Sequence, residues 1–214
     1  MKMRMKNNII ITLFTCALLA LPASRAEAFI HFTQNTFTTA ESLDPGLTQM
    51  GVFFTLGDDY KSFYPGIRYG LAPLIEIGAR FGATSADIDS EDKLGGLLGV
   101  DLKYQIIKQT EDIPVDMALD LGLDNTIINN KNATELTFSA IFSRGFALTE
   151  QGYKLVPYGG IEMAALYGSL IPDNKTSIYA FGGFEWKISQ KVALLMEIKA
   201  GGSTLGGIGI KFEY

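Results

Sequence analysis

The sequence has only one cysteine and one histidine in 214 residues, and this shortage excludes several kinds of chemistry. Cys16 lies in an apolar N-terminal stretch that we expect to be removed, so the mature chain has no thiol for catalysis or disulfide bonds. His31 is the only candidate for a histidine general base, and no nucleophile system can be recognised beside it. We therefore expect no enzymatic activity.

Sequence patterns that bind phosphate or metal are also lacking. The Gly201–Gly209 run contains no Lys followed by Ser or Thr, so it is not a phosphate-binding loop. The acidic segment 87–92 is not an EF-hand, because Asp92 and Leu98 occupy the places of its Gly and closing Glu. This segment is interpreted as a solvated acidic loop, with loose divalent-cation binding left open. We predict no cofactor and no dedicated metal site.

Residues 1–28 have the features of an export signal. A basic start precedes an apolar stretch from about Ile9 to Leu21, and Ala26-Glu27-Ala28 matches a small-residue cleavage site. The apolar stretch is shorter than the roughly 20 residues that a membrane-spanning helix needs. We expect cleavage near Ala28. A lipid-attachment box at residues 13–16 fits badly because of its Phe and Thr.

The mature chain is acidic and of single-domain length. Removal of Lys2, Arg4, Lys6, Arg25 and Glu27 leaves 14 basic and 22 acidic residues, which gives a net charge of −8. Such a chain is a poor nucleic-acid binder, so no nucleic-acid partner is expected. A mature length of about 186 residues without a linker rich in Pro or Ser predicts one domain.

From residue 47 onward the pattern predicts strands and no helices. Apolar residues recur at every second position in segments of about ten residues, which are separated by turn residues. The sequence predicts an all-β fold with about ten antiparallel strands, or eight if two segments are extended loops. The expected strands are 47–57, 61–71, 74–84, 94–107, 114–124, 134–146, 153–168, 176–187, 190–201 and 205–214.

The two faces of each predicted strand differ sharply in charge. Ile75, Ile77 and Phe81 alternate with Glu76 and Arg80, and the other strands repeat this separation. In a soluble sandwich the charged face would meet water, whereas in a membrane barrel it faces the lumen and lipid covers the apolar face. The export signal, the aromatic C-terminus and the many glycines of the polar face favour a single transmembrane β-barrel.

Thirteen charged side chains are expected to face the lumen. They either pair into a network that fills a narrow barrel, or they line a narrow, slightly cation-preferring pore. Hydrolysis by a pair of acids, Asp116 and Asp120, stays formally open, but such a pair more often accepts bonds from Arg or Lys. The thirteen are Arg68, Glu76, Arg80, Asp101, Lys103, Asp116, Asp120, Glu162, Glu185, Lys187, Glu197, Lys199 and Lys211.

Aromatic residues recur near the predicted strand ends. A ring at that depth lies half in lipid and half in water, so these residues suit the interfacial girdles of a membrane barrel. They lack the basic neighbours of a base-stacking platform. The expected girdle residues are Tyr64, Tyr69, Tyr104, Phe142, Phe146, Tyr153, Tyr158, Tyr167, Trp186 and Tyr214.

Three features together resemble the small bacterial outer-membrane β-barrel proteins. They are the export signal, the turn 70–73 followed by Ile75-Glu76-Ile77-Gly78, and the C-terminal alternation of Ile208, Ile210, Phe212 and Tyr214. The last is similar to the assembly signal of that family, with Tyr where Phe is commoner. The resemblance implies location in the outer membrane and contact with its lipid and lipopolysaccharide. It also implies insertion by the outer-membrane assembly machinery, with periplasmic chaperones as transient partners.

The expected organisation is a signal peptide at 1–28, a periplasmic lead-in segment or partial plug at 29–46, and a barrel domain at 47–214. With the C-terminus in the periplasm, the compact turns lie on the inner side, and the longer segments 86–92, 125–133 and 170–175 lie outside. The function expected is a structural or surface-interaction role with a charge-filled lumen. The alternative is a narrow porin-like channel for ions or small solutes. The sequence does not predict the solute, the partner or the oligomeric state.

Overall fold

The structure, a computed structural model, describes residues 34, 36–57, 59–88, 91–148, 153–171 and 173–214. The predicted export signal and its cleavage site lie outside the described residues, as do Cys16 and His31. In the described part of the chain no helix is long and apolar enough to span a membrane.

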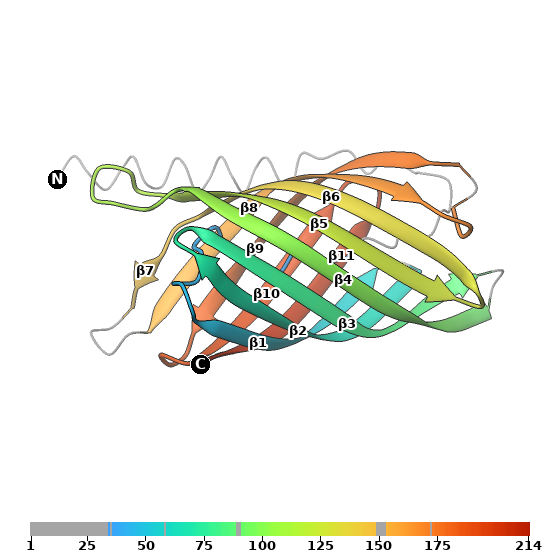
Figure 1. Ribbon diagram of the computed structural model, residues 1–214, viewed down its shortest axis with the longest axis horizontal. Helices are drawn as coiled ribbons and strands as arrows, with labels where there is room; N and C mark the ends of the chain where they lie inside the picture. Colours follow the sequence, from blue (N-terminus) through green and yellow to red (C-terminus); the bar gives the residue numbers. More distant parts are fainter. Residues whose placement is uncertain (1–33, 35, 58, 89–90, 149–152, 172) are drawn as a thin grey trace.

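Ten long antiparallel strands form a closed barrel (Figure 1). Neighbours in sequence are neighbours in the sheet, and the pairings β1–β11 and β6–β8 close it, while the two-residue strand β7 only extends the β8 edge. The prediction of about ten strands is confirmed, and the alternative of eight is wrong. The strands are β1 Thr48–Gly57, β2 Tyr60–Ala72, β3 Ile75–Ile88, β4 Glu91–Ile107, β5 Asp116–Ile128, β6 Lys131–Ser143, β7 Phe146–Ala147, β8 Lys154–Tyr167, β9 Lys175–Lys187, β10 Val192–Ala200 and β11 Thr204–Glu213.

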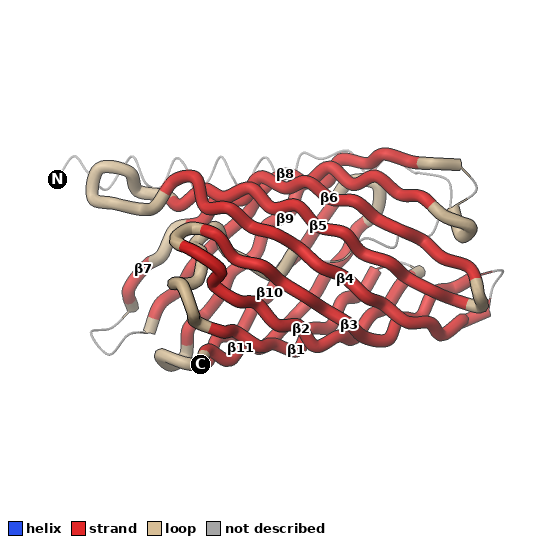
Figure 2. The backbone as a smooth tube through the Cα atoms, in the orientation of Figure 1, coloured by secondary structure: helices blue, strands red, loops and turns tan. Residues whose placement is uncertain are grey.

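The two ends of the barrel differ in their connections. We call the end that holds Tyr214 the C-terminal end and the opposite end the far end. The longest described connection, 108–115, and the β7–β8 hairpin both lie at the C-terminal end, at the left in Figures 1 and 2. At the far end, Asn129 and Asn130 both have positive φ, of 50° and 61°. This is a two-residue hairpin turn whose twist lets β5 and β6 pair up to their tips.

This arrangement corrects the prediction of long outer loops. Most of the segment 86–92 belongs to the paired ends of β3 and β4, and most of 125–133 belongs to β5 and β6. The polar side chains of these segments had suggested loops. Polar residues also suit the tip of a strand that extends beyond the lipid-covered part of the barrel, because water contacts both faces of the strand there.

The outside of the barrel is apolar along its whole circumference. Large side chains that alternate with the lumen-facing positions point outward on every long strand, such as Ile77 on β3, Leu121 on β5 and Ile198 on β10, each about half exposed. The inward positions of the same strands hold buried charges and hydroxyls. This inversion of the usual protein surface is stable only where the solvent around the barrel is lipid.

Most of the predicted girdle aromatics point outward. Tyr69, Tyr104, Phe142, Phe146, Tyr153, Tyr167, Trp186 and Tyr214 are all exposed. The girdle prediction is wrong for Tyr64 and Tyr158, which are 2% and 4% exposed and lie inside the lumen. Their position parity gives the reason, because Tyr64 shares a face with Arg68 and Tyr158 shares a face with Glu162.

A charge placed on the outer face distinguishes lipid from water as its surroundings. Leu121 lies near the middle of β5, whereas Leu94 lies near the far end of β4. We expect Leu121→Arg to lower the free energy of unfolding in lipid vesicles by about 2–4 kcal/mol, and Leu94→Arg by about 0–1 kcal/mol. Urea titrations followed by tryptophan fluorescence measure both. Equal, small losses for the two variants would mean that lipid does not cover this face.

Candidate functional site

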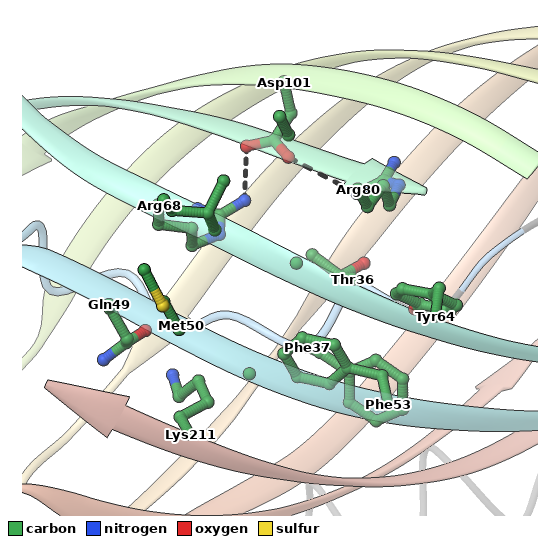
Figure 3. A pocket seen from close by; sticks show the side chains of 14 residues that line it. Thr36, Phe37, Gln49, Met50, Phe53, Tyr64, Arg68, Arg80, Asp101 and Lys211 are labelled. Atoms are coloured by element: carbon green, nitrogen blue, oxygen red, sulfur yellow. Dashed lines mark hydrogen bonds and ion pairs between the residues drawn. The ribbon is translucent and has the colours of Figure 1, made fainter. Parts of the chain in front are cut away.

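Of the described residues of the predicted lead-in segment, 34 and 36–43 lie inside the barrel, and 44–46 are exposed at its mouth. We call the segment 34–43 the plug. Phe37, Thr38 and Ala40 are 3%, 2% and 0% exposed, and Gln34 is also buried. Figure 3 shows Thr36 and Phe37 on a strandless stretch of chain beside the walls formed by β1 and β2. A periplasmic lead-in does not fit these residues, whereas the alternative of a partial plug does. Residues 29–33 lie outside the described part.

The plug runs lengthwise through the lumen. At the C-terminal end, the N–H of Gly46 donates to the carbonyl of Gly70 over 2.9 Å, and a positive φ of 86° at Gly46 turns the chain into β1. Towards the far end, the Gln34 side chain bonds the hydroxyl of Tyr60, the first residue of β2, and accepts from Ser62 over 2.8 Å. The described chain therefore crosses most of the length of the barrel.

Carboxylates and amides of the wall accept the main-chain N–H groups of the plug. An extended segment without a neighbouring strand has no ladder to satisfy its main chain, so side chains must do so. Glu197 accepts from the N–H groups of Thr36 and Phe37, over 2.7 and 2.8 Å. Further on, Ser143 accepts from Ala40 N, Gln105 from Ser42 N and Glu76 from Leu43 N, over 2.9–3.1 Å.

Two buried lysines donate to the main-chain carbonyls of the plug. Lys103 Nζ reaches the carbonyl oxygens of Thr39 and Glu41 over 2.8 and 3.0 Å, and also the Thr38 hydroxyl over 2.9 Å. Lys199 Nζ donates to the carbonyl of Gln34 over 2.5 Å. The wall thus binds both kinds of main-chain group along the plug.

Two apolar pockets hold plug side chains three residues apart. Phe37 stacks on Phe53 at a centroid distance of 5.1 Å and packs with Tyr64, Leu97 and Leu195. The Phe53 ring fits because Gly51 and Gly209 leave room, since a Cβ on either would lie within 2.5 Å of it. Ala40 lies in a second pocket, formed by Ala118, Ile141, Tyr158 and Phe181, where it has no exposed surface.

A chain of ion pairs links β2, β3, β4 and β5 beside the plug. Arg68 pairs with Glu76 and with Asp101. Arg80 pairs with the other oxygen of Asp101 over 3.3 Å and with both oxygens of Asp124, its Nε lying 2.6 Å from Oδ1. Lys103 pairs with Glu76 over 2.9 Å, which connects this chain of charges to the plug.

The opposite wall holds two more ion pairs. Lys199 pairs with Glu162 over 2.8 Å, and Ser139 donates to the same carboxylate over 3.0 Å. Lys211 pairs with Glu185 over 2.6 Å. All of these groups are at least nine-tenths buried. Buried charges need such compensation, because removal of one partner leaves the other charge without solvent or a counterion.

The C-terminal mouth of the barrel carries a looser group of charges. Glu41 of the plug pairs with Lys154 over 2.8 Å and lies 3.9 Å from Lys187. Partial burial raises the pKa of Glu41, but Lys187 and Lys154 outweigh this and hold the pKa below its usual value. Lys187 is 29% exposed, so it lies at this mouth and not deep in the lumen.

Two of the predicted lumen acids, Asp116 and Asp120, form no ion pair with Arg or Lys within the described residues. Asp116 accepts instead from the Gln105 side chain over 2.8 Å and from the N–H of Gln109 over 2.7 Å. Asp120 is also buried, and its Oδ1 has no hydrogen-bond partner among the described residues. Nothing in the described structure arranges these two acids around a nucleophile.

Sequence reasoning missed two lumen acids and most of the plug. Asp124 and Glu135 are each 2% exposed inside the barrel. Both residues lie at the ends of predicted strands, 114–124 and 134–146. Asp124 has the same position parity as Asp116 and Asp120, so the alternation of the sequence was sufficient to place it in the lumen. The plug gave only a weak signal, its Thr-rich composition followed by the turn at 43–46.

Little empty space remains around the middle of the plug. The cavity between the plug, β1, β2 and the Arg68–Asp101–Arg80 chain has a volume of about 30 Å³ (Figure 3), enough for one or two waters. Larger cavities of about 150 and 620 Å³ are lined by C-terminal-end residues, including Glu41 and Lys108 in both. In the described part of the chain, no group of three His, Cys, Asp or Glu residues could hold a metal ion.

The charged lumen, the apolar circumference and the outward aromatics at the strand ends decide the class of the protein. The chain is a transmembrane β-barrel. Strand β11 agrees with this, because Ile208, Ile210 and Phe212 lie on its outer side, opposite the inward Lys211, and the exposed Tyr214 follows it. The hydrogen-bonded closure leaves no open sheet edge in the barrel wall, as a strand structure in lipid requires.

The chain is only distantly similar to known proteins. No family model and no curated protein matches the sequence. The solved structures to which it is similar include three bacterial membrane barrels. The N-terminal β-barrel domain of Pseudomonas aeruginosa OprF has 11% identity and a TM-score of 0.39, covering 80% of this chain and 100% of that one. The β domain of the Bordetella autotransporter BrkA has 11% identity and a TM-score of 0.49, with the same coverages. An outer membrane channel from Pseudomonas putida F1 has 12% identity and a TM-score of 0.44, covering 82% and 98%.

Proposed function

We propose that this protein is a sealed outer-membrane barrel with a structural or surface-interaction role and no enzymatic activity, its lumen closed by the plug and by paired charges. The observation that carries this proposal is the plug itself, whose main chain is bound by Glu197, Lys103 and Lys199 inside the barrel. The cavity of only about 30 Å³ beside Phe37 supports it, because an ion path needs continuous water.

The proposed surroundings follow from the barrel exterior and from the two ends. The apolar circumference contacts outer-membrane lipid, and β11 with its outward Tyr214 serves as the assembly signal read by the insertion machinery. Periplasmic chaperones carry the unfolded chain to that machinery. The exposed Lys61 and Lys131 near the far end suit the phosphates of lipopolysaccharide. In this orientation the C-terminal end faces the periplasm.

The electrical conductance of the intact protein tests this proposal. Refolded protein in a planar lipid bilayer should give no reproducible current steps, because the plug excludes a continuous water path. Insertion is verified in parallel by protection of the barrel from protease in vesicles of the same lipid. Regular, cation-selective steps from the intact protein would overturn the sealed-barrel proposal.

Removal of two wall carboxylates separates a sealed barrel from a pore. In Glu76→Ala with Asp101→Ala, Arg68 loses both of its carboxylate partners and Lys103 loses its pair with Glu76. We expect the free energy of unfolding to fall by about 3–5 kcal/mol while the bilayer stays electrically silent. Urea unfolding and bilayer recording on the same preparation measure both. A changed ion selectivity with unchanged stability would favour a conducting lumen.

One observation favours a second candidate function, a narrow cation channel that opens when the plug leaves. Carboxylates outnumber basic groups among the buried side chains of the wall. The plug offsets part of this excess through its N–H groups and the Thr36 hydroxyl, which carry no net charge. The wall acids are Glu76, Asp101, Asp116, Asp120, Asp124, Glu135, Glu162, Glu185 and Glu197, and the bases are Arg68, Arg80, Lys103, Lys199 and Lys211.

A further inference from the structure

We propose that the lumen is a binding site for an extended polypeptide, and that the plug is its ligand supplied by the same chain. This inference rests on the sealed-barrel proposal and adds what the lumen recognises. Eight hydrogen bonds join wall side chains to main-chain groups of residues 34–43, five to N–H groups and three to carbonyls. Any extended peptide without proline at the donating positions offers the same groups.

The binding groups belong to the wall and not to the plug. Lys103 and Glu76 come from β4 and β3, and Lys199 and Glu197 come from β10. The first pair binds the plug near the C-terminal end and the second pair binds it further along. Each of the two pairs places one donor and one acceptor along an extended chain, which is the pattern that a neighbouring strand would offer.

Two pockets add a preference for particular side chains. Phe37 fills the pocket of Phe53, Tyr64, Leu97 and Leu195, and Ala40 fills its own pocket with no exposed surface. A larger side chain than Ala at the second position would clash, because extra methylene groups destabilise a close-packed interior. The site therefore selects an aromatic residue followed, three positions later, by Ala or Gly.

The tether explains why the plug occupies this site. Residues 44–46 are exposed at the C-terminal mouth and join the plug directly to β1. So short a link holds the plug at a high effective concentration, in the millimolar range for short flexible linkers. Cutting the link should leave the plug bound as a separate peptide, whose release then depends on concentration.

Peptide exchange in the folded full-length protein tests this inference. A protease recognition sequence is inserted between Pro45 and Gly46, and the barrel is cut after refolding. We expect the released N-terminal fragment to stay with the barrel during size-exclusion chromatography in detergent. A fluorescein-labelled synthetic peptide of residues 34–45 should then replace it, which is measured by anisotropy. Loss of the fragment together with no peptide uptake, while the barrel keeps its β-sheet circular dichroism, would overturn the inference.

Matched peptides identify what is recognised. N-methylation at Phe37 removes a bond to Glu197 and should weaken binding about ten-fold to a hundred-fold. N-methylation at Glu41 is the control, because this N–H donates no hydrogen bond within the described residues. A peptide with Ala40→Leu should also bind at least about ten-fold more weakly. Equal binding of all four peptides would overturn main-chain recognition.

The same experiment separates this inference from the proposed function. The conductance of the uncut protein tests whether the lumen is sealed, and peptide exchange tests whether the wall binds a polypeptide. An uncut barrel that conducts overturns the sealed-barrel proposal even if peptides bind. A barrel that is silent when uncut, but loses the fragment and takes up no peptide after cutting, leaves the seal in place and overturns the binding site.

Discussion

Deletion of residues 29–42 should convert an electrically silent barrel into a cation-selective pore. The deletion removes Phe37 and Ala40 from the lumen and frees the Glu197 carboxylate from the two N–H groups that it binds. Water then enters a lumen with more acids than bases, and a ring of acids favours cations. Planar-bilayer recording in a salt gradient measures the change, with a reversal potential that shifts towards the cation equilibrium value.

A variant of the full-length chain provides the control for this deletion. Glu197→Ala removes the acceptor of two plug N–H groups and leaves the rest of the plug in place. It should give brief, intermittent openings, whereas Glu41→Gln at the mouth should stay silent, because a half-exposed ion pair contributes only about 0–1 kcal/mol. A deletion variant that folds, inserts and remains silent would show that the plug is not what closes the barrel.

Loss of Arg80 should be among the most damaging single changes to stability. Among the described residues, Arg80 is the only cation that pairs with Asp124, which is 2% exposed. Arg80→Met keeps much of the side-chain volume but leaves this carboxylate buried and uncompensated. We expect the free energy of unfolding to fall by about 3–5 kcal/mol, measured by urea titration in lipid vesicles.

The matching double variant shows whether the loss comes from the unpaired charge. Arg80→Met with Asp124→Leu removes both charges, while Asp101 keeps its pair with Arg68. This variant should be more stable than Arg80→Met alone by at least about 2 kcal/mol, because a buried pair replaced by apolar side chains costs little. If the double variant were less stable than either single one, packing and not charge would explain the effect of Arg80.

The sequence was sufficient to predict the barrel because the evidence for it is local. Alternation between Ile77 and Glu76, or between Leu121 and Asp120, depends only on neighbours along the chain. The same rule predicted the inward positions of Glu76, Asp101 and Lys103, which are buried. It would also have placed Tyr64, Tyr158 and Asp124 in the lumen had parity been given precedence over strand ends. Strand ends are less certain, because polar tips such as 125–133 resemble loops.

The pairing of the charges and the position of the plug could not be read from the sequence. Arg80 on β3 pairs with Asp124 two strands away, which depends on register and side-chain length. The plug has no periodicity, because its main-chain groups are bound by side chains from β3, β4, β6 and β10 and not by a neighbouring strand. The position of the plug depends on the closed lumen, in which Glu197 and Lys103 bind its main chain.

A disulfide crosslink tests the position of the plug most directly. The expected cleavage near Ala28 would remove Cys16, the one cysteine of the sequence, so a pair of introduced thiols would have no competitor. The N–H of Ala40 lies 3.1 Å from the Ser143 hydroxyl, so Ala40→Cys with Ser143→Cys should form a disulfide in the membrane-inserted protein. Ser62 contacts Gln34, six residues along the plug, so Ala40→Cys with Ser62→Cys should not. Mass spectrometry of tryptic fragments detects the crosslink. Its absence in the first pair, or equal crosslinking in both, would contradict a plug held in one position inside the barrel.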